Sequence, residues 1–506
     1  MKRRHKKSSG LSKKNGGTAE NTPVSGTTRR GFLVTTAAGA GLFLVGKAGA
    51  QDAAAPATPA PEAAPTVPAE AAAPAAAAEA AVPAAAAPVA APAIIEKTPD
   101  ILNLAIIGTG AEGQVLLDAM SKIPGLQFKA VCDIWTYNRK IGAGRLKKAG
   151  HIVNAYEDYR EMLAAEKDLD AVIIATPDFV HAEHSIACMQ AGLHVYCEKE
   201  MSNSLEKARE MVLTSRATGR LLQIGHQRRS NPRYHHAINR VLHEQKLIGR
   251  LTQGFAQWNR SKSEDIGFPK LYPIPPETLE KYGYASMDHF RNWRWYKKYG
   301  GGPIVDLGSH QIDIFTWVYQ TPPKSVSACG GVDFYTHHEW YDNVMAIFDY
   351  DSPDGVTRAF YQVLTTTSNG AFYESFSGEY GTLVLSELSN RGDHVFREAI
   401  APEWDQHAKQ GLLLAMTEPE SKKAKTRNTV IDTRVSPEPD KWQLPIVLNK
   451  PAHQPHLENF FDAIRNGVPL NCPGEIGYET AVAVLKVNDA VEAGQKLHFQ
   501  PQEFLV

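Results

Sequence analysis

Cysteine is scarce in this sequence, and no pair of cysteines has the spacing of a redox or zinc motif. The 506 residues include five cysteines, and none of them forms a Cys-x-x-Cys pair. Because such pairs are the usual sequence sign of structural zinc, we expect no metal site. Cys132, Cys188 and Cys197 lie in apolar segments, so we expect small core residues rather than a disulfide framework.

An excess of charge of one sign is also lacking. The chain has 54 lysines and arginines against 55 aspartates and glutamates, which gives a formal net charge of −1. A protein without a strong positive field does not attract nucleic acid over its whole surface. We therefore expect no nucleic-acid partner, and we assign the basic cluster within residues 2–14 to a targeting segment.

The most apolar run near the N-terminus, residues 32–45, is too short for a membrane-spanning helix, which needs about 20 residues. Arg29 and Arg30 precede this run, and Ala48-Gly49-Ala50 follows it with the small residues of a cleavage site. Residues 1–50 therefore predict a twin-arginine signal peptide. We expect periplasmic or other exported localisation and no stable membrane insertion after cleavage, with an uncleaved anchor as the alternative.

The composition divides the remaining chain into three parts. Residues 51–98 are almost entirely Ala, Pro and Glu, so they cannot bury a core and predict an extended, disordered linker. Strands and helices alternate over residues 99–225, which predicts a doubly wound parallel sheet. The expected strands are Ile101–Ile107, Leu126–Cys132, Ala171–Ala175, Leu193–Cys197 and Leu221–Ile224, with helices at Ala111–Lys122 and Ser204–Thr218.

Residues 226–506 have a different pattern. Longer alternating runs predict strands with one face open to solvent, at Leu251–Trp258, Val344–Tyr350, Arg358–Thr367 and Tyr373–Ser386. Helices are expected at Asp306–Tyr319, Pro455–Arg465 and Gly477–Ala493. The polar stretch Asn390–Pro445 is expected to be an irregular surface excursion. The fold class is therefore an α/β Rossmann domain followed by an α+β domain with an open, mostly antiparallel sheet.

A glycine-rich loop follows the first expected strand. Gly108, Gly110 and Gly113 form a G-x-G-x-x-G pattern, in which glycine permits a tight turn, close approach of a pyrophosphate and close helix packing. Asp133 ends the second strand, where a carboxylate accepts hydrogen bonds from ribose hydroxyls and repels a 2′-phosphate. The pattern predicts a bound nicotinamide cofactor, NAD rather than NADP, although Arg139 leaves NADP open.

Further candidate residues follow the later strands. Thr176 and Pro177 end the strand Ala171–Ala175, where ligands bind in parallel sheets, and we expect them to line the cofactor. His181 lies nearby and is expected mainly to pack its helix. Glu198 and Lys199 follow the next strand; the lysine is suited to contact cofactor and substrate and to favour a developing alkoxide, with a solvated surface pair as the alternative.

Asp306 and His310 are four residues apart at the start of an apolar helix, so they share one face. An aspartate and a histidine that project together are suited to abstract a hydroxyl proton, although Asp306 could equally serve as a helix cap. The segment Phe290–Tyr299 is rich in aromatic residues, which either stack on a sugar ring or pack a core.

Together these motifs resemble the glucose–fructose oxidoreductase/inositol dehydrogenase/rhizopine catabolism family, known as Gfo/Idh/MocA. The resemblance rests on AIIGTGAEG, ATPDFVHAEHSIACMQAGLHVYCEK, QIGHQRRSNPRYH and GGGPIVDLGSHQIDI, in that order. It implies that Lys199, Asp306 and His310 are catalytic and that the second sheet forms a homo-oligomer. The exported arrangement is similar to glucose–fructose oxidoreductase, which implies a tightly bound cofactor.

The resemblance implies hydride transfer between nicotinamide and a carbinol of a small sugar or polyol. An NAD-dependent glycoside hydrolase that oxidises its sugar transiently remains an alternative, and so does a non-catalytic cofactor-binding protein. One residue departs from the pattern, because Glu200 stands where the family usually has proline after the Glu-Lys pair. Proline would stiffen this loop, so the family pattern does not fix the geometry of the loop around Lys199 in this chain.

Overall fold

The computed structural model describes residues 100–388, 390–415 and 436–506. The expected signal peptide (1–50) and linker (51–98) lie outside these residues. Among the described residues, no helix combines the length and the apolar character that a membrane crossing requires. All five cysteines are free thiols, and Cys132, Cys188 and Cys197 are buried, as predicted.

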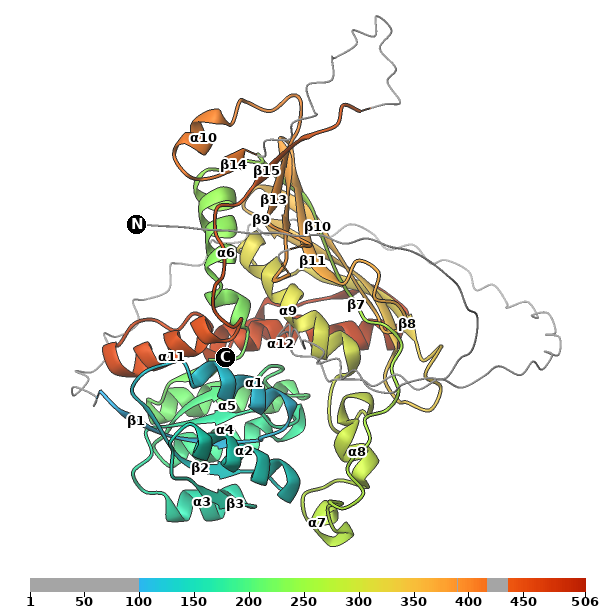
Figure 1. The fold of residues 1–506 in the computed structure, drawn as a ribbon. Coiled ribbons are helices and arrows are strands. Elements are labelled where there is room, and N and C mark those ends of the chain that lie inside the picture. Colours follow the sequence, from blue (N-terminus) through green and yellow to red (C-terminus); the bar gives the residue numbers. More distant parts are fainter. Residues whose placement is uncertain (1–99, 389, 416–435) are drawn as a thin grey trace, which may run out of the picture. The chain divides into compact units, whose positions relative to one another are not determined.

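The first described part of the chain is a six-stranded parallel sheet in the order β3-β2-β1-β4-β5-β6 (Figure 1). Its strands are β1 (Leu102–Ile107), β2 (Leu126–Cys132), β3 (Asn154–Tyr156), β4 (Ala171–Ile174), β5 (His194–Cys197) and β6 (Leu222–Ile224). The helices between them are α1 (Ala111–Met120), α2 (Thr136–Lys148), α3 (Tyr159–Ala165), α4 (Asp178–Gln190) and α5 (Leu205–Thr218). This doubly wound sheet confirms the predicted Rossmann domain.

The second sheet has ten strands in the order β14-β15-β13-β12-β11-β7-β10-β9-β8-β16. They are β7 (Leu251–Asn259), β8 (Ser325–Gly331), β9 (Asn343–Ser352), β10 (Gly355–Leu364), β11 (Phe372–Gly378), β12 (Gly381–Leu385), β13 (His394–Arg397), β14 (Leu414–Ala415), β15 (Asp440–Gln443) and β16 (Leu497–His498). Among the described strands of this second sheet, only β7 and β10 pair in parallel, so the sheet is mostly antiparallel, as predicted.

Two predictions about this sheet were wrong. The run Tyr373–Ser386 is not one strand but two, β11 and β12, which pair antiparallel around a tight connection. The stretch Asn390–Pro445 is not wholly irregular, because its described residues contribute β13 and β15 to the sheet and bury Trp404 and Leu413. Residues 416–435 of this stretch lie outside the described part.

The helices of the second part are α6 (Pro232–His235), α7 (Pro276–Lys281), α8 (Met287–Arg291), α9 (Gly302–Tyr319), α10 (Asp405–Lys409), α11 (Gln454–Asn466) and α12 (Gly474–Ala493), with the π-helix η2 (His236–Glu244) and the 3-10 turns η1 (Gln227–Ser230), η3 (Trp293–Trp295) and η4 (Pro501–Phe504). Helix α9 is buried along nearly its whole length against the second sheet. It therefore holds its polar side chains at fixed positions.

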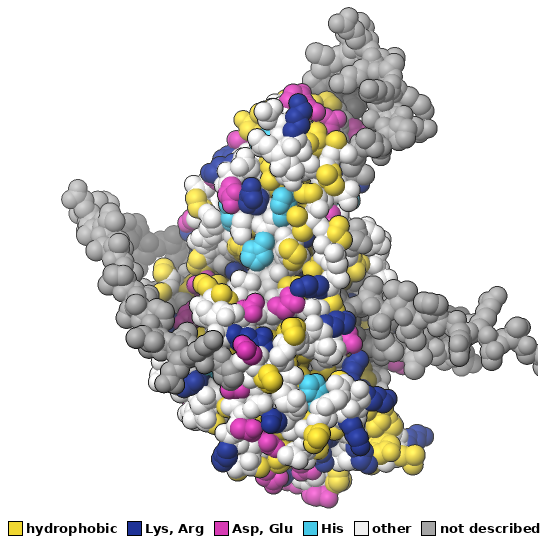
Figure 2. Space-filling view, turned by 60° about the vertical axis from the view of Figure 1, so that its left-hand side comes forward, with side chains coloured by type: hydrophobic (Ala, Val, Ile, Leu, Met, Phe, Trp, Pro, Cys, Tyr) yellow, Lys and Arg dark blue, Asp and Glu magenta, His cyan; other side chains and the backbone are white. Residues whose placement is uncertain are grey.

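The C-terminal helices return to the first sheet. Phe460 and Phe461 of α11 share a hydrophobic cluster with Leu104 and Ile106 of β1, and Figure 1 shows α11 and α12 in red beside the blue and green domain. The backbone of Ile224 also donates a hydrogen bond to the carbonyl of Cys472. These contacts hold the two sheets in one arrangement, so residues from both can meet. On the described part of the face in Figure 2, acidic, basic and hydrophobic side chains are intermixed.

Candidate active site

The glycine-rich loop connects β1 to α1, and its backbone shape excludes larger residues. Gly108 has a φ of +90°, and a Cβ there would lie 2.4 Å from the carbonyl oxygen of Ala175. A Cβ on Gly113 would lie 2.1 Å from the carbonyl oxygen of Gly108. Gly110 is the N-cap of α1 and offers no side-chain cap, so the first amides of the helix remain available to a phosphate.

Asp133 lies at the end of β2 beside this loop. One carboxylate oxygen accepts a hydrogen bond from the backbone amide of Thr109 at 2.8 Å, and the other accepts one from the amide of Trp135 at 2.8 Å. Burial raises the pKa of Asp133, although these amides oppose the shift. The hydroxyl of Thr109 also donates to the first of these oxygens, at 3.3 Å. Arg139 donates to the backbone oxygen of Asp133 at 2.5 Å and lies 3.8 Å from Glu157.

Thr176 and Pro177 lie between β4 and α4, and His181 fixes this turn. The two ring nitrogens of His181 lie 2.6 Å from the carbonyl oxygen of Thr176 and 2.7 Å from that of Glu200. Burial lowers the pKa of His181 to about 4, so near pH 7 the ring is neutral and its single N–H donates to one of these two oxygens. His181 therefore lies between the loops after β4 and β5 and is hydrogen-bonded to one of them.

Lys199 and Asp306 meet although they are far apart in sequence. The ammonium of Lys199 donates to the backbone oxygen of Asp306 at 2.6 Å and lies 3.3 Å from its Oδ1. Both side chains are largely buried, at 10% and 12% exposure. The peptide bond between Lys199 and Glu200 is cis. The two contacts with Asp306 place Lys199 against the start of α9.

Two arginines that the motif analysis did not single out complete this cluster. Arg294 lies 3.0 Å from Oδ1 of Asp306, and Arg260 lies 3.9 Å from Oδ2. Burial alone would raise the pKa of Asp306, but the charges of Arg294, Lys199 and Arg260 outweigh it and hold the pKa well below its usual range. Asp306 is therefore ionised at neutral pH and anchors the lysine.

His310 lies one helical turn after Asp306, with its ring 5.4 Å from that of Trp258. Its Nδ1 is buried without a hydrogen-bond partner among the described residues. Burial, followed by the charges of Lys199 and Arg228, holds the pKa of His310 well below its usual value. The imidazole is therefore neutral at physiological pH, the form that can accept a proton. In the described residues no hydrogen bond joins His310 to Asp306.

Sequence reasoning missed several polar residues at this edge of the sheet. Burial raises the pKa of Asp178, the first residue of α4, to about 7, while Lys199 opposes and Asp306 adds to the shift. His226 follows β6, and burial lowers its pKa to about 4. Both residues lie after the carboxyl end of a parallel strand, the place where such sheets bind ligands, and that position was the available signal.

Glu112, Glu198 and His453 form a second polar group beside the glycine-rich loop. Oε1 of Glu112 lies 3.3 Å from Nε2 of His453, a residue at the start of α11. Burial and the neighbouring Glu112 raise the pKa of Glu198 to about 7. The potential ligand atoms of all three lie within 4.8 Å of one another, so this group places acidic charge next to the expected pyrophosphate position.

The aromatic segment Phe290–Tyr299 belongs mainly to a core. Tyr296 and Tyr299 are buried in a hydrophobic cluster with Trp135 and Tyr284, and Phe290, Trp293 and Trp295 pack against it. Arg294 extends from this segment to Asp306. The aromatic residues therefore fix an arginine of the cluster, and a role in sugar stacking stays a prediction.

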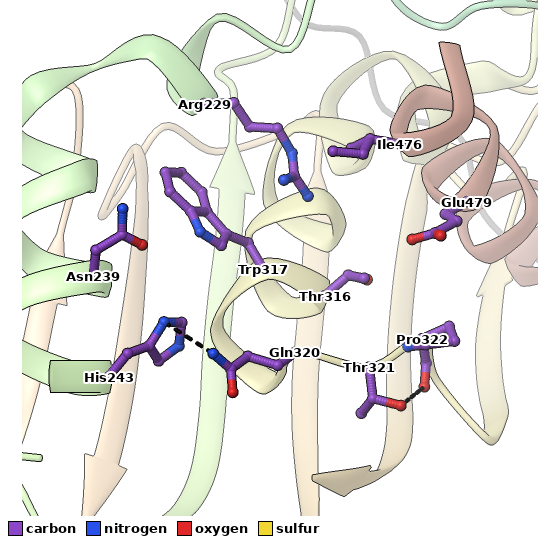
Figure 3. A pocket seen from close by; sticks show the side chains of 10 residues that line it. All are labelled: Arg229, Asn239, His243, Thr316, Trp317, Gln320, Thr321, Pro322, Ile476 and Glu479. Atoms are coloured by element: carbon purple, nitrogen blue, oxygen red, sulfur yellow. Dashed lines mark hydrogen bonds between the residues drawn. The ribbon is translucent and has the colours of Figure 1, made fainter. Parts of the chain in front are cut away.

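A cavity of about 400 Å³ lies at a different place, between η2, α9 and α12. Figure 3 shows that Trp317 and Arg229 face this cavity from one side and Glu479 from another. Arg229 also pairs with Asp313 at 2.7 Å. None of Lys199, Asp306 or His310 lines it, so this cavity is separate from the candidate active site.

Comparison with known families gives two matches along the chain. Residues 102–226 match the family described as "Oxidoreductase family, NAD-binding Rossmann fold", and residues 277–384 match the "GFO/IDH/MocA C-terminal domain". The first match covers the glycine-rich loop and Lys199. The second covers Arg294, Asp306 and His310. The cofactor domain predicted from the loop is therefore confirmed as an NAD-binding Rossmann domain.

Individual relatives match only part of the chain. D-glucoside 3-dehydrogenase of Escherichia coli is 30% identical over 46% of this chain and 58% of its own length. A glycosyl hydrolase family 109 protein of Solibacter usitatus is 29% identical over 42% of this chain and 47% of its own length. The chain thus spans about half the length of these relatives.

Among solved structures, the WlbA dehydrogenase from Bordetella pertussis in complex with NADH and UDP-GlcNAcA has a TM-score of 0.56 at 18% identity. The match covers 79% of this chain and 99% of that one. At this identity the likeness concerns the fold, in which a Rossmann domain precedes a mostly antiparallel sheet.

Proposed function

Because residues 102–226 and 277–384 belong to the Gfo/Idh/MocA oxidoreductase family, we propose that this chain is a sugar or cyclitol dehydrogenase. It transfers a hydride between a carbinol carbon of its substrate and a nicotinamide cofactor. The proposal rests mainly on one observation, the buried contact between Lys199 of the Rossmann domain and Asp306 of the second domain. This contact places a fixed cation beside a neutral histidine.

The residues of the glycine-rich loop fit a dinucleotide. The backbone at Gly108 and Gly110 and the amides of α1 would hold the pyrophosphate, since a Cβ at Gly108 would fill the turn. Asp133 would accept hydrogen bonds from the adenine ribose and would repel a 2′-phosphate, which favours NAD over NADP. When bound, the nicotinamide supplies the acceptor or donor of the hydride.

The chemistry on the protein side requires one proton acceptor and one cation. Lys199 would hold the reacting hydroxyl and stabilise negative charge as it develops on oxygen. His310 would take the hydroxyl proton on Nε2, since Nδ1 is buried. In the reverse direction the same nitrogen returns the proton to the oxygen. Asp306 keeps the ammonium of Lys199 in place. This combination also argues against a non-catalytic binding protein, which has no need of it.

The proposal predicts a measurable redox reaction. The purified chain would be mixed with NAD or NADP and with sugars, glycosides, uronic acids and cyclitols, while nucleotide absorbance at the NADH band is followed. Denaturation of a separate sample releases any retained nucleotide for identification. We expect substrate-dependent reduction of NAD, or of retained nucleotide. The absence of any redox change with every carbinol class, in protein shown to bind NAD, would contradict the proposal.

The relative named as a glycosyl hydrolase family 109 protein supports a second candidate. A glycosidase of this type oxidises its sugar transiently, eliminates the aglycone and returns the hydride, so its cofactor is not consumed. Asp178, with a pKa raised to about 7 by burial, could protonate the departing oxygen. Aryl glycosides distinguish the two functions, because release of the aglycone without net NADH favours the hydrolase.

Export and assembly are further parts of the proposal. Arg29 and Arg30 before an apolar run support twin-arginine export, and the change of both to lysine should retain the precursor in the cytoplasm.

The solvent-side face of the second sheet carries stacked Phe255 and Phe360, with ring centroids 5.6 Å apart. We propose that this face pairs with a second copy of the chain. Phe360→Glu should then reduce the mass measured by light scattering.

A further inference from the structure

Away from the Lys199–Asp306 contact, the structure brings three metal-ligating side chains together. His337 and His338 lie between β8 and β9, and Asp265 lies in the segment after β7. Nε2 of His337 is 3.2 Å from Oδ2 of Asp265, and Nε2 of His338 is 2.8 Å from Oδ1. The three ligand atoms all lie within 4.8 Å of one another. The carboxylate of Asp265 thus faces the Nε2 atoms of both imidazole rings.

We propose that Asp265, His337 and His338 bind one divalent transition-metal ion of the zinc type. Imidazole nitrogen suits zinc, nickel and copper, whereas magnesium and calcium prefer sites built from oxygen alone. Zinc bonds of about 2.0–2.2 Å in a tetrahedral site place neighbouring ligand atoms roughly 3.3 Å apart. The imidazole nitrogens of His337 and His338 lie 3.2 Å and 2.8 Å from different oxygens of Asp265, so an ion at this place would contact both rings and one or both carboxylate oxygens. Three protein ligands leave the fourth position to water.

Packing fixes one ligand of this site before any ion binds. The ring of His338 is stacked on Trp295, with centroids 4.2 Å apart and planes 19° apart, and it is stacked on Tyr335 at 5.3 Å and 24°. Its side chain is only 1% exposed, whereas His337 is 62% exposed. A ligand held in this way loses little freedom on metal binding. His337 and Asp265 form the open side, where an ion can enter.

The site would connect segments that also position the candidate active centre. The hydroxyl of Tyr335 accepts a hydrogen bond from the amide of Ser263, two residues before Asp265. Trp295, beneath His338, directly follows Arg294, which pairs with Asp306. An ion would therefore fasten the segment after β7 to the segment between β8 and β9, and would hold both against the turn that carries Arg294. Its role is structural and takes no part in hydride transfer.

The first test is direct metal binding by the full chain without a histidine tag. The protein would be treated with a chelator, dialysed and titrated with zinc by calorimetry, with elemental analysis of the bound metal. We expect one zinc ion per chain, a melting temperature that rises with zinc concentration, and no competition from magnesium. Cobalt should bind the same site and show the visible absorption of a four- or five-coordinate ion. No binding at micromolar zinc would overturn the proposal.

Variants locate the ion. Removal of groups that only support metal ligands lowers affinity about 10–100-fold, so Asp265→Asn and His337→Gln should each weaken zinc binding at least that much. His498→Ala, which removes an exposed histidine elsewhere, is the matched control and should bind as the unmodified chain does. Asp265 and His337 are chosen because they lie on the open side, so their variants should fold.

Two outcomes would contradict the assignment. Full zinc affinity in both Asp265→Asn and His337→Gln would show that the cluster is only a pair of histidine–aspartate hydrogen bonds. Loss of binding in Glu112→Gln, with binding retained in the other two variants, would move the ion to the group of Glu112, Glu198 and His453. Because the readout is metal content and melting temperature, failure of the proposed dehydrogenase activity would not affect it.

Discussion

The cofactor side and the substrate side of the candidate active site are built in different ways. The cofactor side is a short stretch of backbone with no room for side chains at two glycines. A Cβ on Gly108 would meet Ala175, and a Cβ on Gly113 would meet Gly108. The substrate side is a set of charged side chains from distant segments, since Lys199 and Asp306 are 107 residues apart. The first needs the absence of side chains, whereas the second needs particular ones.

This difference indicates how each side should fail when it is changed. A backbone cradle is sensitive to any added atom, and its loss affects folding and nucleotide binding together. A charged cluster held by α9 and the loop after β5 can lose one functional group while the fold around it remains. Variants of the substrate side should therefore separate catalysis from binding, and variants of the cofactor side should not.

The largest expected effect is on turnover. His310→Ala removes the proposed proton acceptor, and Lys199→Ala removes the cation that stabilises the developing oxyanion. Loss of a positioned general base costs about 10²–10⁴-fold in rate, and we expect a fall of that order in kcat for each variant. Nucleotide affinity, measured by fluorescence titration of NADH, should remain within a few-fold of the unmodified chain.

The pH profile provides an independent check on His310. Because burial and nearby cations lower its pKa, the imidazole stays neutral well below pH 6.5 and protonates only at more acidic pH. The acidic limb of kcat/KM should therefore lie below the ordinary histidine range. An acidic limb centred near pH 6.5 would assign the base to another group. Weak nucleotide binding in His310→Ala would mean that the residue belongs to the cofactor side.

The contrast also explains how much could be predicted from the sequence. The strands that carry the glycine-rich loop and Lys199 were predicted almost to the residue, because buried parallel strands are short apolar runs between turn signals. In the second sheet, β8, β13 and β15 were not predicted. Their sequences are polar or interrupted, as for β13, His394–Arg397, and only pairing with neighbouring strands specifies them.

The partners of Asp306 show the same limit at the level of side chains. Asp306 was singled out because it precedes a histidine on a helical face, a local pattern. Its contacts with Arg294 and Arg260 depend on how the aromatic segment and β7 pack around α9. Likewise, Asp265 and His337 are 72 residues apart, and no spacing rule joins them. Sequence patterns predict the elements, but the tertiary fold determines which charges meet.

On the cofactor side, Gly108→Ala should disturb folding and binding together. The added Cβ would lie 2.4 Å from the carbonyl oxygen of Ala175, in a residue whose φ is +90°. Gly150 is a matched control, because its φ is +91° and nothing lies within 4 Å of an added Cβ. Both changes carry backbone strain of about 1–3 kcal/mol. Only Gly108→Ala should also lose NAD binding, measured by calorimetry. Equal behaviour of the two variants would mean that the loop does not hold the cofactor.

A smaller effect is expected for the ribose contact. Asp133→Ala removes the carboxylate that would receive the ribose hydroxyls, and a hydrogen bond to a charged group contributes about 1.5–3 kcal/mol. NAD should therefore bind roughly tenfold more weakly or worse, and the preference over NADP should shrink. Asp133→Asn keeps an acceptor for the amide of Thr109 or for that of Trp135, but not for both, so it retains part of the loop order while it removes the charge. Strong preference of the unmodified chain for NADP would contradict this assignment.

The smallest effect on function is expected at Glu200, in the loop between the two sides. Its side chain is 1% exposed and accepts a hydrogen bond from the amide of Met201 at 2.8 Å. Burial raises its pKa to about 8 from the usual 4.5, so the folded chain keeps this proton where the unfolded chain has lost it. The stabilising contribution is complete below pH 4.5 and is lost as the pH rises towards 8.

Glu200→Gln resembles the protonated form and does not titrate, so its melting temperature should fall less between pH 6 and pH 9 than that of the unmodified chain. Turnover at pH 7 should change little, since the carboxyl is already neutral there. Melting temperatures that fall in parallel for the two proteins over this pH range would show that Glu200 is already ionised in the fold.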